Sequence, residues 1–175
     1  MANSIEQIGV KAVGAAKAVK AGFNGLRGVF LHLAEEHGEV AALMKPVSKS
    51  SDAQFRREHY PRIRAELLSH ERAELTVVYA MLSNYLDTRD LAAAHNVEAQ
   101  QLEQAIAELD ALDYATPAWG PAYERVYAMV QQHVAEEENS FFPKAQAVLG
   151  EAETSAMLER YEAAKKIVKE TLKPV

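Results

Sequence analysis

The apolar residues of this chain recur at alternating steps of three and four positions along most of its length. This spacing places them on one face of an α-helix, whereas a half-buried strand would alternate apolar and polar residues at every second position. The pattern therefore predicts an all-α protein.

Four long amphipathic segments follow one another after residue 22. Because the connections between them are short, neighbouring helices should run in opposite directions, and the segments predict an antiparallel up-down four-helix bundle. We expect the four helices over residues 23–44, 61–82, 89–112 and 117–143.

Prolines mark several of the expected helix ends. Pro46 closes the first helix, and Pro61 is predicted to open the second, since the first helical position makes no use of the missing N–H. Thr116 is predicted to be the N-cap of the fourth helix, with Pro117 at its first position. Pro143 is expected to kink or shorten the end of that helix.

The bundle should carry further helical segments at both ends. We predict an N-terminal helical arm over residues 1–22, the bundle over residues 23–150, and a C-terminal helix packed on the bundle over residues 151–175. The arm carries lysines among alanines, so a cationic helix on a membrane surface is one interpretation. The arm lacks large apolar anchors, which favours an ordinary surface helix or a partly ordered segment.

Composition and charge exclude several kinds of protein. The chain has 175 residues, of which 49% are apolar, so it is long enough for one domain with a core. It contains no cysteine, and any metal must therefore bind through histidine and carboxylate. The net charge of −6, with both signs interspersed, argues against nucleic acid as a partner.

The sequence also bears on location and on enzyme classes. Glu6 interrupts the N-terminal segment, and no later run approaches the ~18 apolar residues of a membrane span. We therefore expect a cytoplasmic protein that does not bind a membrane. The absence of a nucleophile triad and of a glycine-rich phosphate loop argues against hydrolase and kinase roles.

Six ionisable residues occupy stripe positions where leucine or valine would be expected. They are His37 on the first helix, His70 and Glu74 on the second, His95 on the third, and His133 and Glu137 on the fourth. One such histidine alone is more often a hydrogen-bonded core residue. Burying all six ionisable residues without partners would cost the fold too much free energy, and a metal cluster would satisfy them together.

The spacing of the six residues allows them to meet. Two histidine–glutamate pairs are four residues apart, which places imidazole and carboxylate on the same helical face. In an antiparallel hairpin, residues at equal height are equidistant from the turn. The midpoints between candidate ligands on successive helices fall at Ala53, near Asn84 and at Tyr114, each at or beside a predicted connection.

The two remaining histidines do not fit the cluster. His32 is five residues from His37 and points about 140° away around a helix, so it should face outward or pack between helices. His59 lies eleven residues before His70, about 16 Å away along a helix axis, and is expected in a loop.

The order of these motifs resembles the hemerythrin-like family, known as hemerythrin HHE cation-binding domains. Its pattern is a histidine, HxxxE, a histidine and HxxxE on four successive helices, and the resemblance covers residues 23–149. The resemblance implies two iron ions with an oxo or hydroxo bridge, in which Glu74 and Glu137 bridge the ions and the histidines fill the terminal positions. Imidazole and carboxylate would also suit manganese or zinc.

Two further expectations follow from the resemblance and the ligand types. The respiratory members carry a further histidine on the third helix, but here Leu91 and Ala99 stand a turn on either side of His95, which should leave more open coordination positions. Each ligand histidine should also donate its second ring N–H to an outer partner. Neighbours in sequence that could serve are Glu36, Glu71, Glu136, Tyr123 and Tyr127.

These residues support more than one function. The leading interpretation is a binding protein that binds or senses oxygen or a related diatomic molecule and would signal through a separate, unidentified protein. The alternative is a redox-active di-iron protein for peroxide or nitric oxide detoxification, or for iron storage or the repair of iron centres. A purely structural metal is ranked last, because such sites usually have four ligands and are closed.

Overall fold

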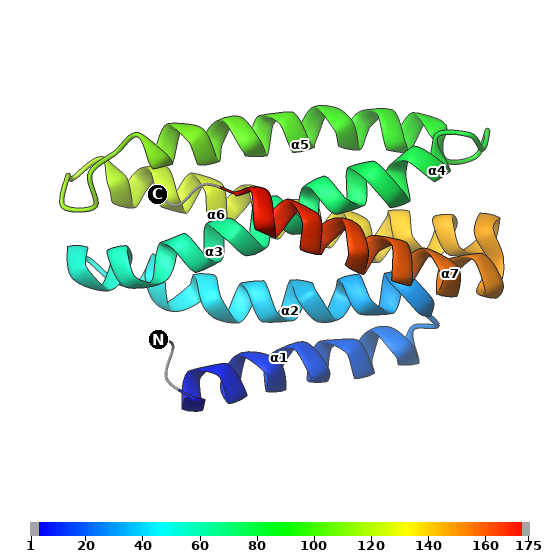
Figure 1. Cartoon of the computed structure of the whole chain (residues 1–175), viewed down its shortest axis with the longest axis horizontal. Helices are drawn as coiled ribbons and strands as arrows, with labels where there is room; N and C mark the ends of the chain where they lie inside the picture. Colours follow the sequence, from blue (N-terminus) through cyan, green and yellow to red (C-terminus); the bar gives the residue numbers. More distant parts are fainter. Residues whose placement is uncertain (1–3, 173–175) are drawn as a thin grey trace.

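The computed structural model describes the backbone of residues 4–172, and the side chains of all of these except residues 4–6 and 23. The prediction of an all-α protein is confirmed, and this part of the chain contains no strand (Figure 1). Its helices are α1 (Ser4–Phe23), α2 (Gly28–Ser48), α3 (Ala53–Ala73), α4 (Ala80–Leu82), α5 (Arg89–Asp110), α6 (Trp119–Glu136) and α7 (Phe142–Thr171), with π-helical segments η1 (Glu74–Tyr79) and η2 (Glu137–Phe141).

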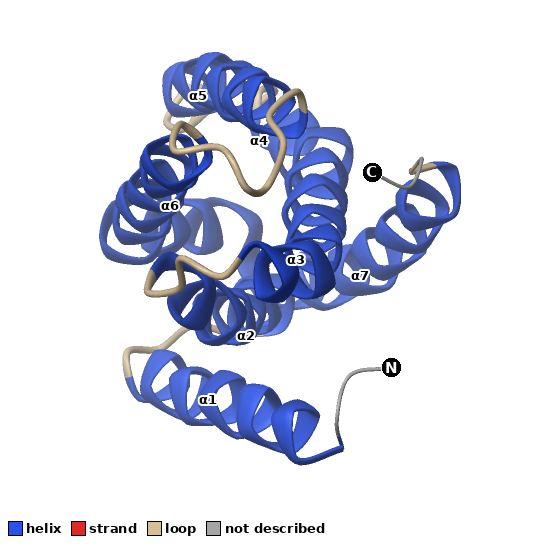
Figure 2. Ribbon diagram, turned by 90° about the vertical axis from the view of Figure 1, so that its left-hand side faces the viewer, coloured by secondary structure: helices blue, strands red, loops and turns tan. Residues whose placement is uncertain are grey.

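Helices α2, α3, α5 and α6 surround a common interior (Figure 2). Helix α2 packs against α3 and α6, and α5 packs against the same two helices. The interior contains two apolar clusters, one around Trp119 and the other around Phe142. On α2, His37 falls between Leu33 of the second cluster and Val40 of the first. The level between the two clusters is therefore where the candidate ligands lie.

Helix α3 begins at Ala53, so the prediction that Pro61 opens it is wrong. Asp52 is the N-cap, and its carboxylate accepts hydrogen bonds from the backbone N–H groups of Gln54 at 2.8 Å and Phe55 at 3.4 Å. This capping satisfies donors that would otherwise be unpaired at the helix start. Pro61 is accommodated inside the helix.

Helix α6 begins at Trp119, later than predicted, with Ala118 in the N-cap position. The hydroxyl of Thr116 donates instead to the carbonyl of Asp113 at 2.8 Å, so Thr116 stabilises the preceding turn and does not cap the helix. Pro117 consequently lies before the helix and not at its first position.

The first bundle helix also differs from its predicted limits. It begins at Gly28, because the chain turns between α1 and α2 through Gly25 at φ 89° and Gly28 at φ 53°. These are left-handed conformations that favour glycine. At its other end α2 continues past Pro46 to Ser48.

The C-terminal part of the chain folds back over the bundle. Pro143 lies in the first turn of α7, where proline is tolerated, and the helical path continues from η2. Gly150, with φ 78° and ψ 172°, breaks the helical geometry inside α7. The segment after Gly150 packs over α2 and α3 (Figure 1). The predicted C-terminal helix is therefore present, although residues 173–175 lie outside the described part.

Helix α1 packs along α2. The two backbones approach closely at Gly14 and Gly38, where a side chain on Gly38 would stand 3.0 Å from the Cα of Gly14. Residues 1–3 of the predicted arm lie outside the described residues. Between residues 4 and 172, no helix combines the length and the apolar character needed to cross a membrane.

Candidate metal centre

The structure brings all six predicted ligand residues to one level of the interior. Their side chains are at most 12% exposed to solvent. They come from four helical segments: His37 from α2, His70 and Glu74 from α3 and η1, His95 from α5, and His133 and Glu137 from α6 and η2.

The first of two ligand groups consists of His37, His70 and Glu137. Each residue offers one donor atom, and these atoms lie within 4.8 Å of one another. The Nε2 atom of His37 is 3.2 Å from Nε2 of His70 and 3.2 Å from Oε2 of Glu137. Two imidazoles and one carboxylate thus face a common point.

The second group consists of Glu71, Glu74, His95 and His133, again with donor atoms within 4.8 Å of one another. Oε1 of Glu71 is 2.8 Å from Nε2 of His95, and Oε2 of Glu71 is 3.6 Å from Nε2 of His133. Glu71 therefore occupies the space beside His95, which the sequence led us to expect to be more open. The sequence also suggested Glu71 as an outer partner, whereas it lies within the inner group.

Two carboxylates connect the groups. Glu74 belongs to the second group, and its Oε2 is 3.1 Å from Nε2 of His70 in the first. Glu137 belongs to the first group, and its Oε2 is 3.2 Å from Nε2 of His133 in the second. Each carboxylate can therefore reach a cation held by either group.

Buried polar atoms at this level lack hydrogen bonds within the described part of the chain. They are Oε1 of Glu71, both carboxylate oxygens of Glu74, Oε2 of Glu137, and Nε2 of His95 and of His133. Several lie close together without the geometry of a hydrogen bond, as Nε2 of His95 and Oε1 of Glu71 do. Unsatisfied buried acceptors are costly, and a metal ion between them would satisfy their lone pairs. The residues present therefore fit a metal centre.

Both connecting carboxylates stand at the first residue of a π-helical segment. Glu74 opens η1 and Glu137 opens η2. A π-turn inserts an extra residue into a helix and re-aims the side chains beside it, and such turns are frequent at functional sites. In η1 the last residue, Tyr79, donates a hydrogen bond of 2.5 Å to Oε1 of Glu137. Its ring also stacks on His95, with the ring centres 3.5 Å apart.

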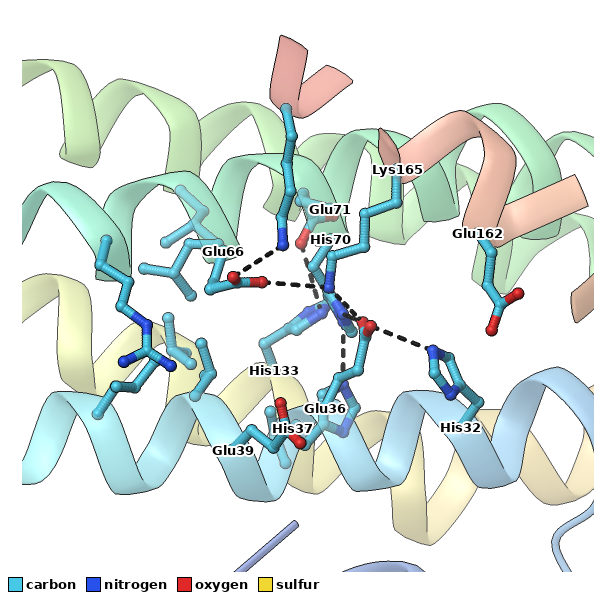
Figure 3. A pocket seen from close by; sticks show the side chains of 18 of the residues that line it. His32, Glu36, His37, Glu39, Glu66, His70, Glu71, His133, Glu162 and Lys165 are labelled. Carbon is cyan, nitrogen blue, oxygen red and sulfur yellow. Dashed lines mark hydrogen bonds and ion pairs between the residues drawn. The ribbon is translucent and has the colours of Figure 1, made fainter. Parts of the chain in front are cut away.

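The histidines of the first group have outer partners. Glu36, which the sequence suggested as an outer partner, has its Oε2 2.8 Å from Nδ1 of His70 (Figure 3). The same oxygen accepts a hydrogen bond of 2.6 Å from the hydroxyl of Tyr161. Nδ1 of His37 is 2.8 Å from Oε1 of Glu138. Such contacts fix each ring and leave Nε2 facing the cluster.

Two other outer partners suggested by the sequence, Glu136 and Tyr123, are wrong. Glu136 is exposed and accepts from Gln132, and the hydroxyl of Tyr123 donates to the carbonyl of Met44. Glu136 therefore lies on the exposed face of its helix, and Tyr123 lies in the apolar cluster around Trp119.

The cluster shifts the pKa values of its members. Burial opposes charge on His70, but the carboxylates of Glu74 and Glu36 outweigh it and raise the pKa of His70 to about 10. Burial likewise opposes charge on His133, and the nearby Glu137 and Glu71 raise its pKa to about 10. Burial and the Glu137 carboxylate raise the pKa of Glu74. Without metal, the imidazoles of His70 and His133 therefore hold protons that compensate nearby carboxylates.

The two histidines excluded by the sequence stay outside both groups. His32 lies at the edge of the site, with Nε2 3.1 Å from Oε1 of Glu36. His59 lies within α3 and not in a loop as predicted, because the helix begins before it. Its ring stacks on Phe55, and its Nδ1 is 2.8 Å from the carbonyl of the same residue.

Comparison with known proteins identifies the family. The hemerythrin HHE cation-binding domain matches residues 30–145. The chain therefore belongs to this family, and the family together with the histidine–glutamate cluster indicates a metal-ion-binding protein.

A curated relative adds a distant similarity. A DNA nickase from Nostoc sp. (strain PCC 7120) is 22% identical to this chain over 137 residues, which are 78% of this chain and 39% of the relative. The chain thus spans well under half of that protein's length. No solved structure matches this chain.

Proposed function

We propose that this chain is a non-haem di-iron protein, in which an antiparallel up-down bundle of α2, α3, α5 and α6 holds two ions bridged by Glu74 and Glu137. The observation that carries this proposal is the position of these two carboxylates, each of which lies near histidines of both groups. A single four-coordinate structural ion would leave part of this donor set unused.

The donor set divides between two ions. His37 and His70 would hold one ion, and His95, His133 and Glu71 would hold the other. Imidazole with carboxylate suits iron, and manganese or zinc would be the competing metals. When bound by these residues, a pair of ferrous ions would supply reversible binding of oxygen or a related diatomic molecule, which is the activity that we propose.

The protein would orient the donors and exclude bulk water. The contacts of His70 with Glu36 and of His37 with Glu138 hold the two rings with Nε2 facing inward. The hydrogen bond from Tyr79 holds one oxygen of Glu137 and leaves the other for metal. Burial strengthens each of these electrostatic contacts.

Anaerobic reconstitution tests this proposal. We expect the chain loaded with Fe²⁺ to develop an oxo-bridge charge-transfer absorption band on exposure to air and to lose it when oxygen is removed. A band that forms and cannot be reversed would instead support the alternative function.

The alternative is a redox-active di-iron protein that removes peroxide or nitric oxide, stores iron or repairs iron centres. Glu71 favours this second candidate, because a third carboxylate makes the site more like the carboxylate-rich di-iron centres of other helical bundles. Turnover of hydrogen peroxide by the loaded protein, compared with a Glu71→Ala variant, separates the two functions.

We also propose that the chain acts in the cytoplasm, without binding a membrane or nucleic acid. The net charge of −6 disfavours contact with a phosphate backbone. Although its relative is a DNA nickase, we expect no nicking of supercoiled plasmid by this chain in the presence of catalase. Nicking above the level of a metal-free control would contradict this part of the proposal.

A further inference from the structure

A cavity of about 560 Å³ lies beside the metal centre. His37, His70 and His133 line its inner end, and Lys165 of α7 lies over it (Figure 3). Cavities of roughly 300–1,000 Å³ are typical of sites for small organic ligands. This space is larger than a diatomic molecule needs.

The inner wall of the cavity is aliphatic. It is formed by Val40, Leu43, Leu67, Leu102 and Val130, which stay 5–9% exposed. On α2 and α5 these residues come after the candidate ligand histidine, and on α3 and α6 they come before it. Because α2 and α5 run in the opposite direction to α3 and α6, all five residues lie toward the same end of the helices (Figure 1). An apolar wall therefore extends from the metal centre along the helix axes.

Arg62 lines the cavity beyond this wall. It stands eight residues before His70 on α3, which corresponds to about 12 Å along the helix axis. Its Nη1 atom is buried and has no hydrogen-bond partner among residues 4–172. A buried guanidinium nitrogen without a partner is costly, and a carboxylate matches its geometry.

Four of the eight other charged side chains that line the cavity outside the metal centre are paired with one another. Glu36 lies 2.7 Å from Nζ of Lys165, and Glu66 lies 2.7 Å from Nζ of Lys169. Glu39, Glu162 and Glu170 also line the cavity and would favour a cationic ligand. The unpartnered nitrogen of Arg62 favours an anion at the end of the cavity away from the histidines.

We propose that this cavity binds a straight-chain carboxylic acid, with the carboxylate on Arg62 and the alkyl chain along the aliphatic wall toward His37 and His133. The side chains themselves form the cavity, so the inference does not depend on the proposed di-iron function. It adds an organic ligand to a centre for which a diatomic ligand is otherwise expected.

Calorimetric titration of the full chain, freed of metal with EDTA, tests this binding site. We expect decanoate to bind with one molecule per chain and about tenfold more tightly than decanol, the gain expected of a charge-assisted hydrogen bond. Acetate, which lacks the alkyl chain, should not bind measurably. Decyltrimethylammonium should bind more weakly than decanoate.

Two variants locate the carboxylate. Arg62→Leu should reduce decanoate binding to the level of decanol, whereas Arg57→Leu, which removes an exposed arginine of the same helix outside the cavity, should leave it unchanged. Val130→Phe, which narrows the aliphatic wall, should weaken both ligands.

The proposal is overturned if wild-type chain binds decanoate and decanol equally, if it binds neither, or if the cationic amphiphile binds best. The comparison of ligands on the wild-type chain needs no variant, so a folding defect of Arg62→Leu cannot obscure it. Iron content is measured separately, and failure of the ligand site is thereby distinguished from failure of the di-iron proposal.

Discussion

Tyr79 donates a hydrogen bond of 2.5 Å to Oε1 of Glu137 and so joins the two π-helical segments across the centre. Both side chains are buried, and the Glu137 carboxylate contributes to raising the pKa of Tyr79 well above its usual value, after the effect of burial. The tyrosine therefore stays protonated as a donor and fixes the carboxylate that we propose as a bridge.

The first prediction concerns this hydrogen bond. Tyr79→Phe should lower the free energy of unfolding of the loaded protein by about 1–3 kcal/mol and should speed the loss of metal to a chelator. Tyr60→Phe is a matched control, because it removes a bond of 2.7 Å to Asp110 away from the centre. The control should lose stability without faster metal loss, and equal metal loss from both variants would contradict a specific role for Tyr79.

The second prediction concerns Glu74, whose two oxygens are buried without hydrogen bonds in the described residues. Glu74→Leu should abolish binding of one or both ions while the helical circular dichroism persists. The same variant should lose little stability when both are metal-free, because Glu74 makes no hydrogen bond within the described residues and the protonated His70 keeps the Glu36 carboxylate as its partner. A metal-free variant that is strongly destabilised would show that Glu74 serves the fold and not a metal.

A third prediction tests Glu71, which we place among the ligands on structural grounds. Glu71→Ala should lower the metal content from two ions to one, with loss at the group that includes His95 and His133. Glu136→Ala is the control, because Glu136 is exposed and accepts a hydrogen bond from Gln132 outside the ligand groups. Atomic absorption on both variants measures the difference, and an unchanged two ions in Glu71→Ala would remove this residue from the site.

A fourth prediction concerns pH. The pKa values of His70 and His133 are raised to about 10 in the absence of metal, so both rings are protonated at neutral pH and must release protons when they bind an ion. Apparent metal affinity should therefore rise from pH 6 toward the pKa, by about tenfold per pH unit for each proton displaced. Calorimetric titration with Mn²⁺ in buffers of different ionisation enthalpy measures the release.

The control for this proton release is His59→Gln, because His59 lies outside both ligand groups. It should behave as wild type in every buffer. A binding enthalpy that does not depend on the buffer would contradict the assignment of His70 and His133 as ligands.

Helical periodicity was sufficient to predict the fold class and which polar residues share a level, because the spacing of residues on a helix face is a property of the sequence alone. Helix starts were harder to predict. Asp52 and Pro61 both signal an N-terminus, and the pattern cannot weigh the capping hydrogen bonds of Asp52 against the cost of an internal proline.

Glu71 shows what the pattern missed at the centre. It precedes Glu74 by three residues and so lies on the same helical face, a signal that could have found it. Its position next to His70 led us to expect an outer partner. The π-turns at Glu74 and Glu137 have no such signal in the spacing of apolar residues, since they depend on how the packed helices meet.

Metal stoichiometry with the visible spectrum tests the central claim most directly. The chain is loaded with Fe²⁺ without oxygen, freed of excess metal, assayed for iron and then cycled between air and argon. The di-iron account predicts two irons per chain and a charge-transfer band that appears in air and disappears under argon. One iron per chain, or none, would contradict a centre bridged by Glu74 and Glu137.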